Sequence, residues 1–266
     1  MNNFLKWDSE LYQKGSIHQL EQGLIAINEL NPKDYEKILD IGCGDCNLTI
    51  ELAKRIPNGQ VVAIDNSSEM IEKAEVNLSH SDVSNISILN MDVMKMTYKN
   101  EFNAIFSNQA LHWIKEQYQI YKLIYEALKP NGRIIIQITP LQFYPYLQRF
   151  MKLTRNKEFR HYFQNIQYHT YYYTEEQIYE FLKNSNFRDI NIKTYIYDFL
   201  GEHFISWESL WAYIISSGLR AFFNAIETED SKRKFFEMFK KIFCETQYKN
   251  GKIRFELNLF LISARK

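Results

Sequence analysis

Two hydrophobic periodicities alternate along the first half of the chain. Short runs of apolar and β-branched residues are typical of buried strands, whereas apolar residues every three or four positions are typical of helices. A helix is predicted from Leu20 to Leu30, where Asn31-Pro32 ends it. Strands are predicted at 37–41, 60–65, 86–90, 103–107 and 133–139, and helices at 48–55, 68–78 and 117–128, the last closed by Lys129-Pro130-Asn131-Gly132. This alternation predicts a parallel sheet with right-handed crossovers and helices on both faces.

The second half has a different pattern. Of the 41 aromatic residues, 28 lie between Leu141 and Asn250, so this region is unusually rich in rings. Helices are predicted at 174–183 and 232–243, and strands at 189–198 and 252–263. Thr174 and Gln177 match a helix-starting capping box. We therefore predict an α/β core with an N-terminal lid segment at 1–140, a mainly helical, aromatic-rich cap interleaved with a late strand at 141–250, and a final core strand at 251–266.

Composition narrows the functional classes. The chain has 32 basic and 32 acidic side chains and no net charge, so we expect no nucleic-acid partner. No apolar run approaches the roughly 18 residues of a membrane span, and the first residues lack the apolar stretch of a signal peptide. Three cysteines are too few for a disulfide framework. We expect a cytoplasmic protein without a membrane span.

The segment after the first predicted strand carries the most specific chemical signal. Asp40-Ile41-Gly42-Cys43-Gly44 leads into a glycine turn and then a helix, where missing Cβ atoms allow a ligand to approach the backbone closely. Asp65 ends the second strand, where its carboxylate can accept hydrogen bonds from both hydroxyls of a ribose. These features also fit a dinucleotide site or a structural turn, although Asn47 stands where the dinucleotide fingerprint requires a third glycine.

At this point the chain resembles class I S-adenosylmethionine-dependent methyltransferases over nearly all of its length. Within that class it is most similar to the group containing the trans-aconitate, juvenile hormone acid and malonyl-carrier-protein methyltransferases. The resemblance implies a doubly wound, mostly parallel, seven-stranded Rossmann-like sheet and S-adenosylmethionine as the cofactor. The matching segments are 38–47, Asp65-Asn66-Ser67-Ser68-Glu69-Met70, Asn90-Met91-Asp92-Val93, Ser107-Asn108-Gln109-Ala110-Leu111-His112-Trp113 and 128–132.

The resemblance also implies roles in cofactor binding. Asp40, Gly42 and Gly44 would hold the methionine part, and Asp65 would hold the ribose hydroxyls. Asp92 would bind the adenine amino group with the Val93 backbone alongside, and Met70 would pack on the adenine face. Asn66 and Asn108 belong to the same cofactor-binding set. The chain departs from the family at Cys46, where the family usually has a third loop glycine.

Candidate acceptor-binding residues are more scattered. His112 and Trp113 follow the fourth strand, at the sheet edge where ligands bind; His112 is either a general base or substrate contact, or a structural histidine beside a buried Trp113. His169 is the second candidate base. Arg220, in a segment similar to one of the trans-aconitate enzymes, pairs either with a substrate carboxylate or with a surface acid. Trp7 and Tyr12 lie in a segment that folds over the cofactor in similar enzymes.

Three further features allow a structural and a functional interpretation. The aromatic residues of the cap either fill its own core or line an apolar acceptor pocket. Cys43 and Cys46 have the spacing of a metal or redox motif, but no second cysteine pair follows, so we predict no metal site and keep a redox switch as a hypothesis. The lysine-rich segment 232–243 has the spacing of an amphipathic helix with a solvated basic face, rather than of an element that binds nucleic acid or a membrane surface.

The resulting functional hypothesis is methyl transfer to an oxygen, first of all a carboxylate, of a small or medium-sized hydrophobic molecule. A carboxylate acceptor requires no general base, whereas a hydroxyl or a carbon acceptor requires one. Methylation of an acyl group on a carrier protein is a second hypothesis, with acyl-carrier protein as the partner. The residues also allow a C- or N-methyltransferase of natural-product metabolism, an NAD-dependent oxidoreductase and a non-catalytic binding module.

Overall fold

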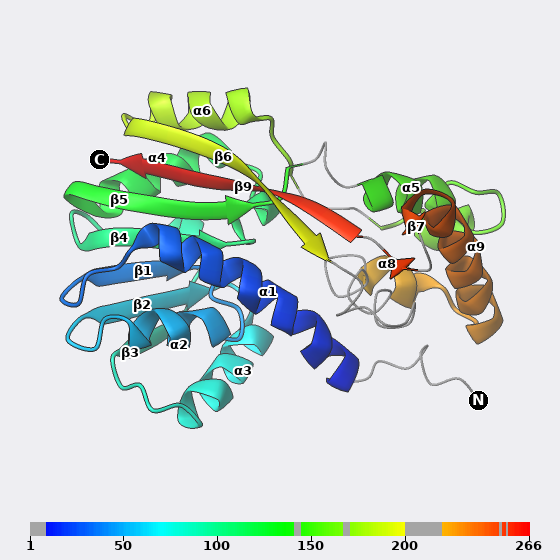
Figure 1. Cartoon of the computed structure of the whole chain (residues 1–266), viewed down its shortest axis with the longest axis horizontal. Helices are drawn as coiled ribbons and strands as arrows, with labels where there is room; N and C mark the ends of the chain where they lie inside the picture. The colour runs from blue at the N-terminus through cyan, green and yellow to red at the C-terminus, as the bar shows by residue number, and fades with distance from the viewer. Residues whose placement is uncertain (1–8, 141–144, 167–170, 200–219, 250–251, 254) are drawn as a thin grey trace. The chain divides into compact units, whose positions relative to one another are not determined.

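The computed structural model describes residues 9–140, 145–166, 171–199, 220–249, 252–253 and 255–266 (Figure 1). The chain forms two compact units. The first, here called the sheet unit, comprises residues 20–141, 169–195 and 259–266. The second, called the aromatic unit, comprises residues 1–19, 142–168 and 196–258. The domain boundaries that we predicted from the sequence stay a prediction.

Seven strands form one sheet, in the order β3-β2-β1-β4-β5-β9-β6. Strands β1 to β5 pair in parallel, and β9 pairs antiparallel to β5. The mostly parallel, seven-stranded sheet predicted by the resemblance is therefore confirmed. The strands are β1 (Lys37–Ile41), β2 (Gln60–Asp65), β3 (Ile86–Asn90), β4 (Phe102–Asn108), β5 (Leu128–Ile138), β6 (Arg188–Phe199) and β9 (Phe255–Arg265). The helices between them are α1 (Ser9–Leu30), α2 (Asn47–Lys54), α3 (Ser68–Ser79), η2 (Val93–Lys95), η3 (Leu111–Trp113), α4 (Gln117–Ala127) and α6 (Glu175–Asn184).

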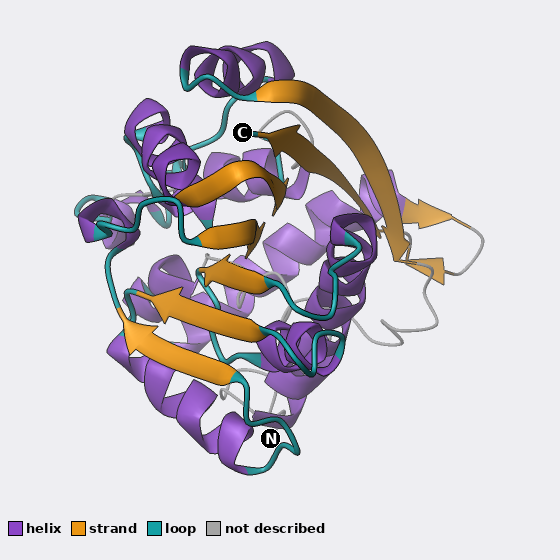
Figure 2. Cartoon of the chain, turned by 90° about the vertical axis from the view of Figure 1, so that its left-hand side faces the viewer, coloured by secondary structure: helices purple, strands orange, loops and turns teal. Residues whose placement is uncertain are grey.

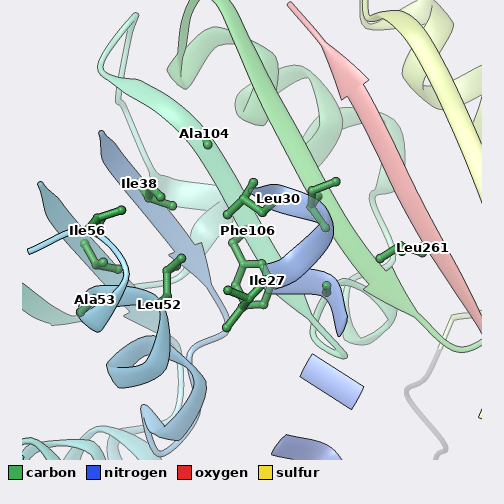
Figure 3. Packing of buried hydrophobic residues seen from close by; sticks show 12 residues of the cluster. Ile27, Leu30, Ile38, Leu52, Ala53, Ile56, Ala104, Phe106 and Leu261 are labelled. Carbon is green, nitrogen blue, oxygen red and sulfur yellow. The ribbon is translucent and has the colours of Figure 1, made fainter. Parts of the chain in front are cut away.

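Both faces of the sheet are covered. On one face Ile27 and Leu30 of α1 pack with Phe106 of β4 in a cluster that also contains residues of α2, β1, β5 and β9 (Figure 3). Successive residues of a strand point to opposite faces of the sheet. Leu39 follows Ile38 in β1 and Ile105 precedes Phe106 in β4, so both point to the other face, and both are fully buried. Helices accordingly lie on both sides of the sheet (Figure 2). Strands buried on both faces read as nearly continuous apolar runs, which is why they were readable in the sequence.

The strand order indicates at which edge of the sheet a ligand can bind. The chain proceeds from β1 outward to β3 and then returns to place β4 on the other side of β1. The loops that follow β1 and β4 therefore lead away from each other, which opens a crevice at the carboxyl ends of these two strands. The glycine turn follows β1, and Gln109, Ala110 and η3 follow β4. Residues that are far apart in the sequence thus meet at one edge.

The predicted element boundaries hold closely, with three differences. Helix α1 begins at Ser9 rather than Leu20, and β8 (Lys252–Ile253) forms a separate hairpin with β7 (Tyr248–Lys249) rather than beginning the last strand. Helix α4 ends at Ala127, as the residues 129–132 predicted, but β5 begins at Leu128 rather than Arg133, because Leu128 already pairs with Phe102 and residues 129–132 bulge inside the strand. Asn131 has a positive φ of 64° there, which suits its turn-forming character. Helix α6 has the predicted capping box between Thr174 and Gln177.

The aromatic unit is built around rings that pack on one another. The ring of Phe150 meets those of Phe222, Phe235 and Phe239 edge-on at 5.7, 5.3 and 6.0 Å. Its helices are α5 (Pro145–Thr154), η5 (Arg160–Phe163), α8 (Arg220–Ala225) and α9 (Glu229–Gln247). Within the described residues these rings form the core of the unit, as one of our two interpretations predicts.

Helix α9 has two contrasting faces. Phe235, Phe236 and Phe239 are buried, whereas Arg233 and Lys234 are exposed, so the predicted amphipathic helix is confirmed. Acidic neighbours pair with its basic residues, Glu229 with Lys232 at 3.0 Å and Glu158 with Lys234. Among the described residues, no helix is both long enough and apolar enough to cross a membrane.

Candidate functional site

The turn after β1 is shaped by two glycines with positive φ, 75° at Gly42 and 56° at Gly44. The backbone N–H groups of Gly42 and Cys43 donate to the Ile64 carbonyl of β2 at 2.8 and 3.1 Å, which holds the turn against the next strand. A Cβ at Gly42 would come within 2.2 Å of the Ala110 Cβ, whereas a Cβ at Gly44 would meet nothing within 4 Å. Gly42 is therefore required for packing inside the protein, and Gly44 borders open space.

Asp65 connects the end of β2 to this turn. Its two carboxylate oxygens accept from the N–H of Gly44 and from the N–H of Ser67, each at 2.9 Å. An ionised carboxylate has about four acceptor positions, so these bonds orient the group and leave room for further donors. Asp65 is thus held in place by two backbone groups while it faces the adjoining pocket.

A pocket of about 350 Å³ opens at this edge of the sheet. Asp65 and Asp92 lie on its wall at the ends of neighbouring strands, and Trp113 lies after β4. The remaining lining residues are Ile41, Gly42, Ile64, Asn66, Ser67, Met91, Val93, Ala110, Leu111 and Ile114. The pocket therefore combines an apolar lining with two carboxylates, which is the character of a small-molecule site.

Asp92 is positioned by the short helix that follows it. Its Oδ1 accepts from the N–H of Met94 at 2.9 Å and so caps η2. The N–H of Met91 donates to the Asp65 carbonyl at 2.9 Å, which ties the loop after β3 to the end of β2. Both pocket carboxylates are therefore fixed by backbone N–H groups.

Asp40 is buried behind the turn, with 2% of its surface exposed. Burial raises the pKa of its carboxyl to about 7, and the charge of Asp65 acts in the same direction, while the hydrogen bond from the Thr49 hydroxyl at 2.7 Å opposes the shift. A nearby positive charge would stabilise the ionised form of such a carboxyl. Asp40 is not among the residues that line the pocket.

The two loop cysteines lie inside the protein. Cys46 has a positive φ of 64° and no exposed surface, and it packs with Cys43, Ala63 and Ile71. The hydrogen bond between the thiols, together with burial, raises the pKa of the Cys43 thiol. Neither cysteine lines the pocket, so the residue that replaces the usual third glycine leaves the pocket open. Both thiols are free, and no group of His, Cys, Asp and Glu suited to a metal ion occurs within the described ranges.

His112 and Trp113 differ in their surroundings. His112 is buried, its ring stacks on that of Tyr172 with 6.1 Å between centroids, and its Nδ1 has no hydrogen-bond partner among the described residues. Burial lowers the pKa of His112 to about 4, so its imidazole is neutral at pH 7. Trp113, for which the sequence left substrate binding and burial beside a structural His112 open, is 47% exposed and lies on the pocket wall. His112 itself does not line the pocket.

The sequence-based candidates divide into three groups. Gly42, Asp65, Asn66, Asp92, Val93 and Trp113 line one pocket. Asp40, Gly44, Met70, Asn108 and His112 belong to the same unit but do not line it. Tyr12 of α1 and Arg220 of α8 belong to the aromatic unit and their side chains are not described, while Trp7 and His169 lie outside the described residues.

Two site features were missed in the sequence. Ala110 fits against Gly42, and only the tertiary packing reveals that contact. Gln137 has no exposed surface, although it stands in the run Ile134-Ile135-Ile136-Gln137-Ile138. A polar residue inside a strand that is apolar on both faces was a readable signal.

The match to a family model decides what this arrangement is. A model described as a methyltransferase domain matches residues 32–186, which is more than half of the chain. The chain belongs to this family. The family that the resemblance implied is thereby confirmed, and the match argues against an oxidoreductase.

Two curated relatives are similar over part of their length. Malonyl-[acyl-carrier protein] O-methyltransferase of Priestia megaterium is 32% identical over 126 residues, which are 46% of this chain and 43% of the relative. Trans-aconitate 2-methyltransferase of an Enterobacter species is 26% identical over 132 residues, which are 50% of each. The matches thus span about half the length of these relatives.

Solved structures share the fold. The YcgJ protein of Bacillus subtilis has a TM-score of 0.61 at 17% identity, covering 94% of this chain and 98% of its own. Phosphoethanolamine N-methyltransferase 2 of Haemonchus contortus, solved with phosphomonomethylethanolamine and S-adenosylhomocysteine, has a TM-score of 0.59 at 22% identity, covering 92% of this chain and 52% of its own. At these identities the similarity concerns the fold alone.

Proposed function

We propose that this chain is an S-adenosylmethionine-dependent methyltransferase that methylates an oxygen, first of all a carboxylate, of a small or medium-sized hydrophobic acceptor. The observation that carries the proposal is the pocket at the ends of β2 and β3, with Asp65 and Asp92 on its wall and the glycine turn at its rim. Membership of the methyltransferase domain family supports it.

The pocket residues suit the nucleoside part of the cofactor. Asp65 is fixed by Gly44 and Ser67 and keeps acceptor positions for two ribose hydroxyls. Asp92 is fixed in the same way by Met94 and would accept from the adenine amino group, with the Val93 backbone alongside. Apolar residues such as Ile64 and Met91 offer flat contact to the base. The open space at Gly44 fits a group that approaches the backbone closely.

When bound, S-adenosylmethionine supplies a methyl group on a positively charged sulfur. The chain's own contribution is to align the acceptor oxygen with that methyl and to exclude water. A carboxylate acceptor needs no base, because its oxygen is already deprotonated, whereas a hydroxyl has to lose a proton. His112, whose ring contacts those of Trp113 and Tyr172, is the residue we assign as base for a hydroxyl acceptor, and its lowered pKa makes it a weak base.

The names of the two relatives support the proposed acceptor class. Both curated names denote acids or their carrier-bound forms, so free carboxylic acids are the first acceptors to test. The second candidate is an acyl group on acyl-carrier protein, favoured by the malonyl-carrier-protein relative. Labelled methyl transfer to free acids and to the corresponding acyl-carrier proteins distinguishes the two. Cofactor binding without methyl transfer across a broad panel of oxygen, nitrogen and carbon acceptors would support a non-catalytic binding module.

The cofactor assignment is tested at Asp65. We expect the change Asp65→Ala to weaken S-adenosylhomocysteine binding by roughly two orders of magnitude, since it removes charge-assisted hydrogen bonds worth about 1.5–3 kcal/mol each. Isothermal titration calorimetry measures the affinity, and Asp82→Ala, at an exposed aspartate before β3, is the matched control. Equal affinities of the Asp65 variant and the wild type would show that the ribose assignment is wrong.

A further inference from the structure

The zero net charge of the chain conceals two units of opposite charge. The sheet unit contains 16 basic and 20 acidic side chains, whereas the aromatic unit contains 16 basic and 12 acidic side chains. Within the aromatic unit the basic excess is concentrated in two segments, 149–160 and 232–241, which together hold ten basic and two acidic residues. These segments therefore attract anions, although the chain as a whole does not.

The two segments pack against each other inside the aromatic unit. The first contains most of α5 and the start of η5, and the second lies in α9, which contacts α5 (Figure 1). The ring of Phe235 lies edge-on to those of Phe150 and Phe159, at 5.3 and 5.1 Å between centroids. Outside this apolar contact, the carboxylate of Glu158 forms an ion pair with Lys234. The basic residues of both segments therefore border one surface.

Six exposed side chains make up this surface, here called the basic surface: Arg155, Lys157, Arg160, Arg233, Lys234 and Lys241. Lys234 and Lys241 are seven positions apart in α9 and so share one face of the helix. Asp230 pairs with Arg233, and Glu158 pairs with Lys234. Within the described residues no ion pair is formed by the other four, Arg155, Lys157, Arg160 and Lys241. The basic surface therefore keeps positive charge for a partner.

The surroundings of these charges indicate the class of partner. A helix that lies on a membrane exposes large apolar side chains, and a site for single-stranded nucleic acid exposes rings on which bases stack. In the described parts of α5, η5 and α9, no large apolar side chain is exposed. The net negative charge of the sheet unit also repels a long polyanion. A compact acidic protein fits the basic surface better than either.

We propose that the basic surface docks an acidic protein that carries the methyl acceptor, namely an acyl-carrier protein. This inference rests on the proposed function and concerns its second acceptor, an acyl group bound to a carrier protein. Carboxylates of the partner accept hydrogen bonds from the guanidinium and ammonium groups of the surface. Complementary charges of this kind speed the encounter and orient the partner, whereas a free acid as acceptor does not need them.

The experiment measures the affinity of the full chain for an acyl-carrier protein of net negative charge, by isothermal titration calorimetry at low salt. We expect the double variant Lys157→Glu, Lys241→Glu to weaken binding by about tenfold or more, because two attractions become repulsions. The matched control is Lys99→Glu, Lys122→Glu, at two exposed lysines of the sheet unit, which changes the net charge equally. The control should stay within about twofold of the wild type, and added salt should reduce the difference between the variants.

S-adenosylhomocysteine affinity, measured on the same proteins, separates this inference from the cofactor assignment. If the wild type binds S-adenosylhomocysteine but not the carrier protein, or if both double variants lose the same affinity, the docking surface is refuted while the proposed function stands. If the wild type does not bind S-adenosylhomocysteine, the proposed function fails and this inference fails with it. Thermal unfolding midpoints verify that both double variants fold.

Duplex DNA and vesicles of anionic phospholipid are the competing ligands of a basic surface. Both are titrated against the wild type under the conditions used for the carrier protein. Tighter binding of either one than of the carrier protein would overturn the proposal. Preferred binding of the carrier protein, weakened in the Lys157, Lys241 double variant and retained in the control, supports it.

Discussion

The polar edge of the sheet unit and the core of the aromatic unit use their side chains in opposite ways. At the edge, Asp65 and Asp92 are each fixed by backbone N–H groups and face a pocket. In the aromatic unit, rings such as those of Phe150 and Phe235 contact mainly one another. The first region therefore depends on particular atoms at particular places, and the second depends on filled volume. A substitution at the polar edge should therefore change mainly ligand affinity, whereas one in the aromatic core should change mainly the free energy of unfolding.

The largest effect is expected in the aromatic unit. Phe150→Ala removes a fully buried ring that contacts three others, and should lower the free energy of unfolding by about 3–5 kcal/mol. Affinity for S-adenosylhomocysteine, measured where the variant is folded, should stay close to that of the wild type. Urea denaturation measures the stability, with the exposed Tyr35→Ala as the control. A large loss of affinity in folded protein would mean that the two regions are not as separate in function as we propose.

A second effect concerns the charge on Asp40. Its pKa is raised from 3.8 to about 7, so in the free protein its carboxyl is protonated below that pH. A ligand ammonium group requires the ionised form, so S-adenosylhomocysteine affinity should fall by up to about tenfold per pH unit below pH 7. Asp40→Asn should flatten this dependence between pH 6 and 8. Methylthioadenosine, which lacks the ammonium group, should show no such slope in either protein.

The raised pKa of Asp40 also makes the free energy of unfolding depend on pH, in a direction that follows from proton linkage. Because the folded pKa lies above the unfolded value, the folded state binds more protons between these two values, and the contribution of Asp40 to stability falls as pH rises through this window. Asp40→Asn should therefore gain stability relative to the wild type from pH 4 to pH 7. Thermal unfolding at several pH values checks this, and a gain that grows toward low pH would contradict it.

The smallest effect on stability is expected at Gly44. A methyl group there meets no neighbouring atom, so Gly44→Ala should cost only about 1–2 kcal/mol for its left-handed backbone. The methyl group would nevertheless enter space that we assign to the ligand, so affinity should fall by about tenfold or more. Gly42→Ala is the matched comparison, because it clashes with Ala110 and should destabilise the protein more. Unchanged affinity in Gly44→Ala would place the ligand elsewhere.

Much of the sheet unit was predictable because its signals are local. The strand at 37–41 was bounded correctly by its apolar run, and Thr174 and Gln177 make their capping box within one helical turn. The strand predicted from Arg133 begins earlier, at Leu128, because the long-range pairing of Leu128 with Phe102 extends β5. For Trp113 the sequence left substrate binding and burial open, and only the folded sheet edge places it half-exposed on the pocket wall.

The sequence by itself determined the strands, the glycine turn and the acids that follow it, since each of these depends on neighbouring residues and on the chemistry of one side chain. Only the tertiary structure decided that Ala110 presses on Gly42, that Cys46 packs away from the pocket, and that Gln22 meets Gln137. These contacts join positions that are distant in the chain. Their geometry follows from the strand order and register of the sheet, which no local pattern of residues encodes.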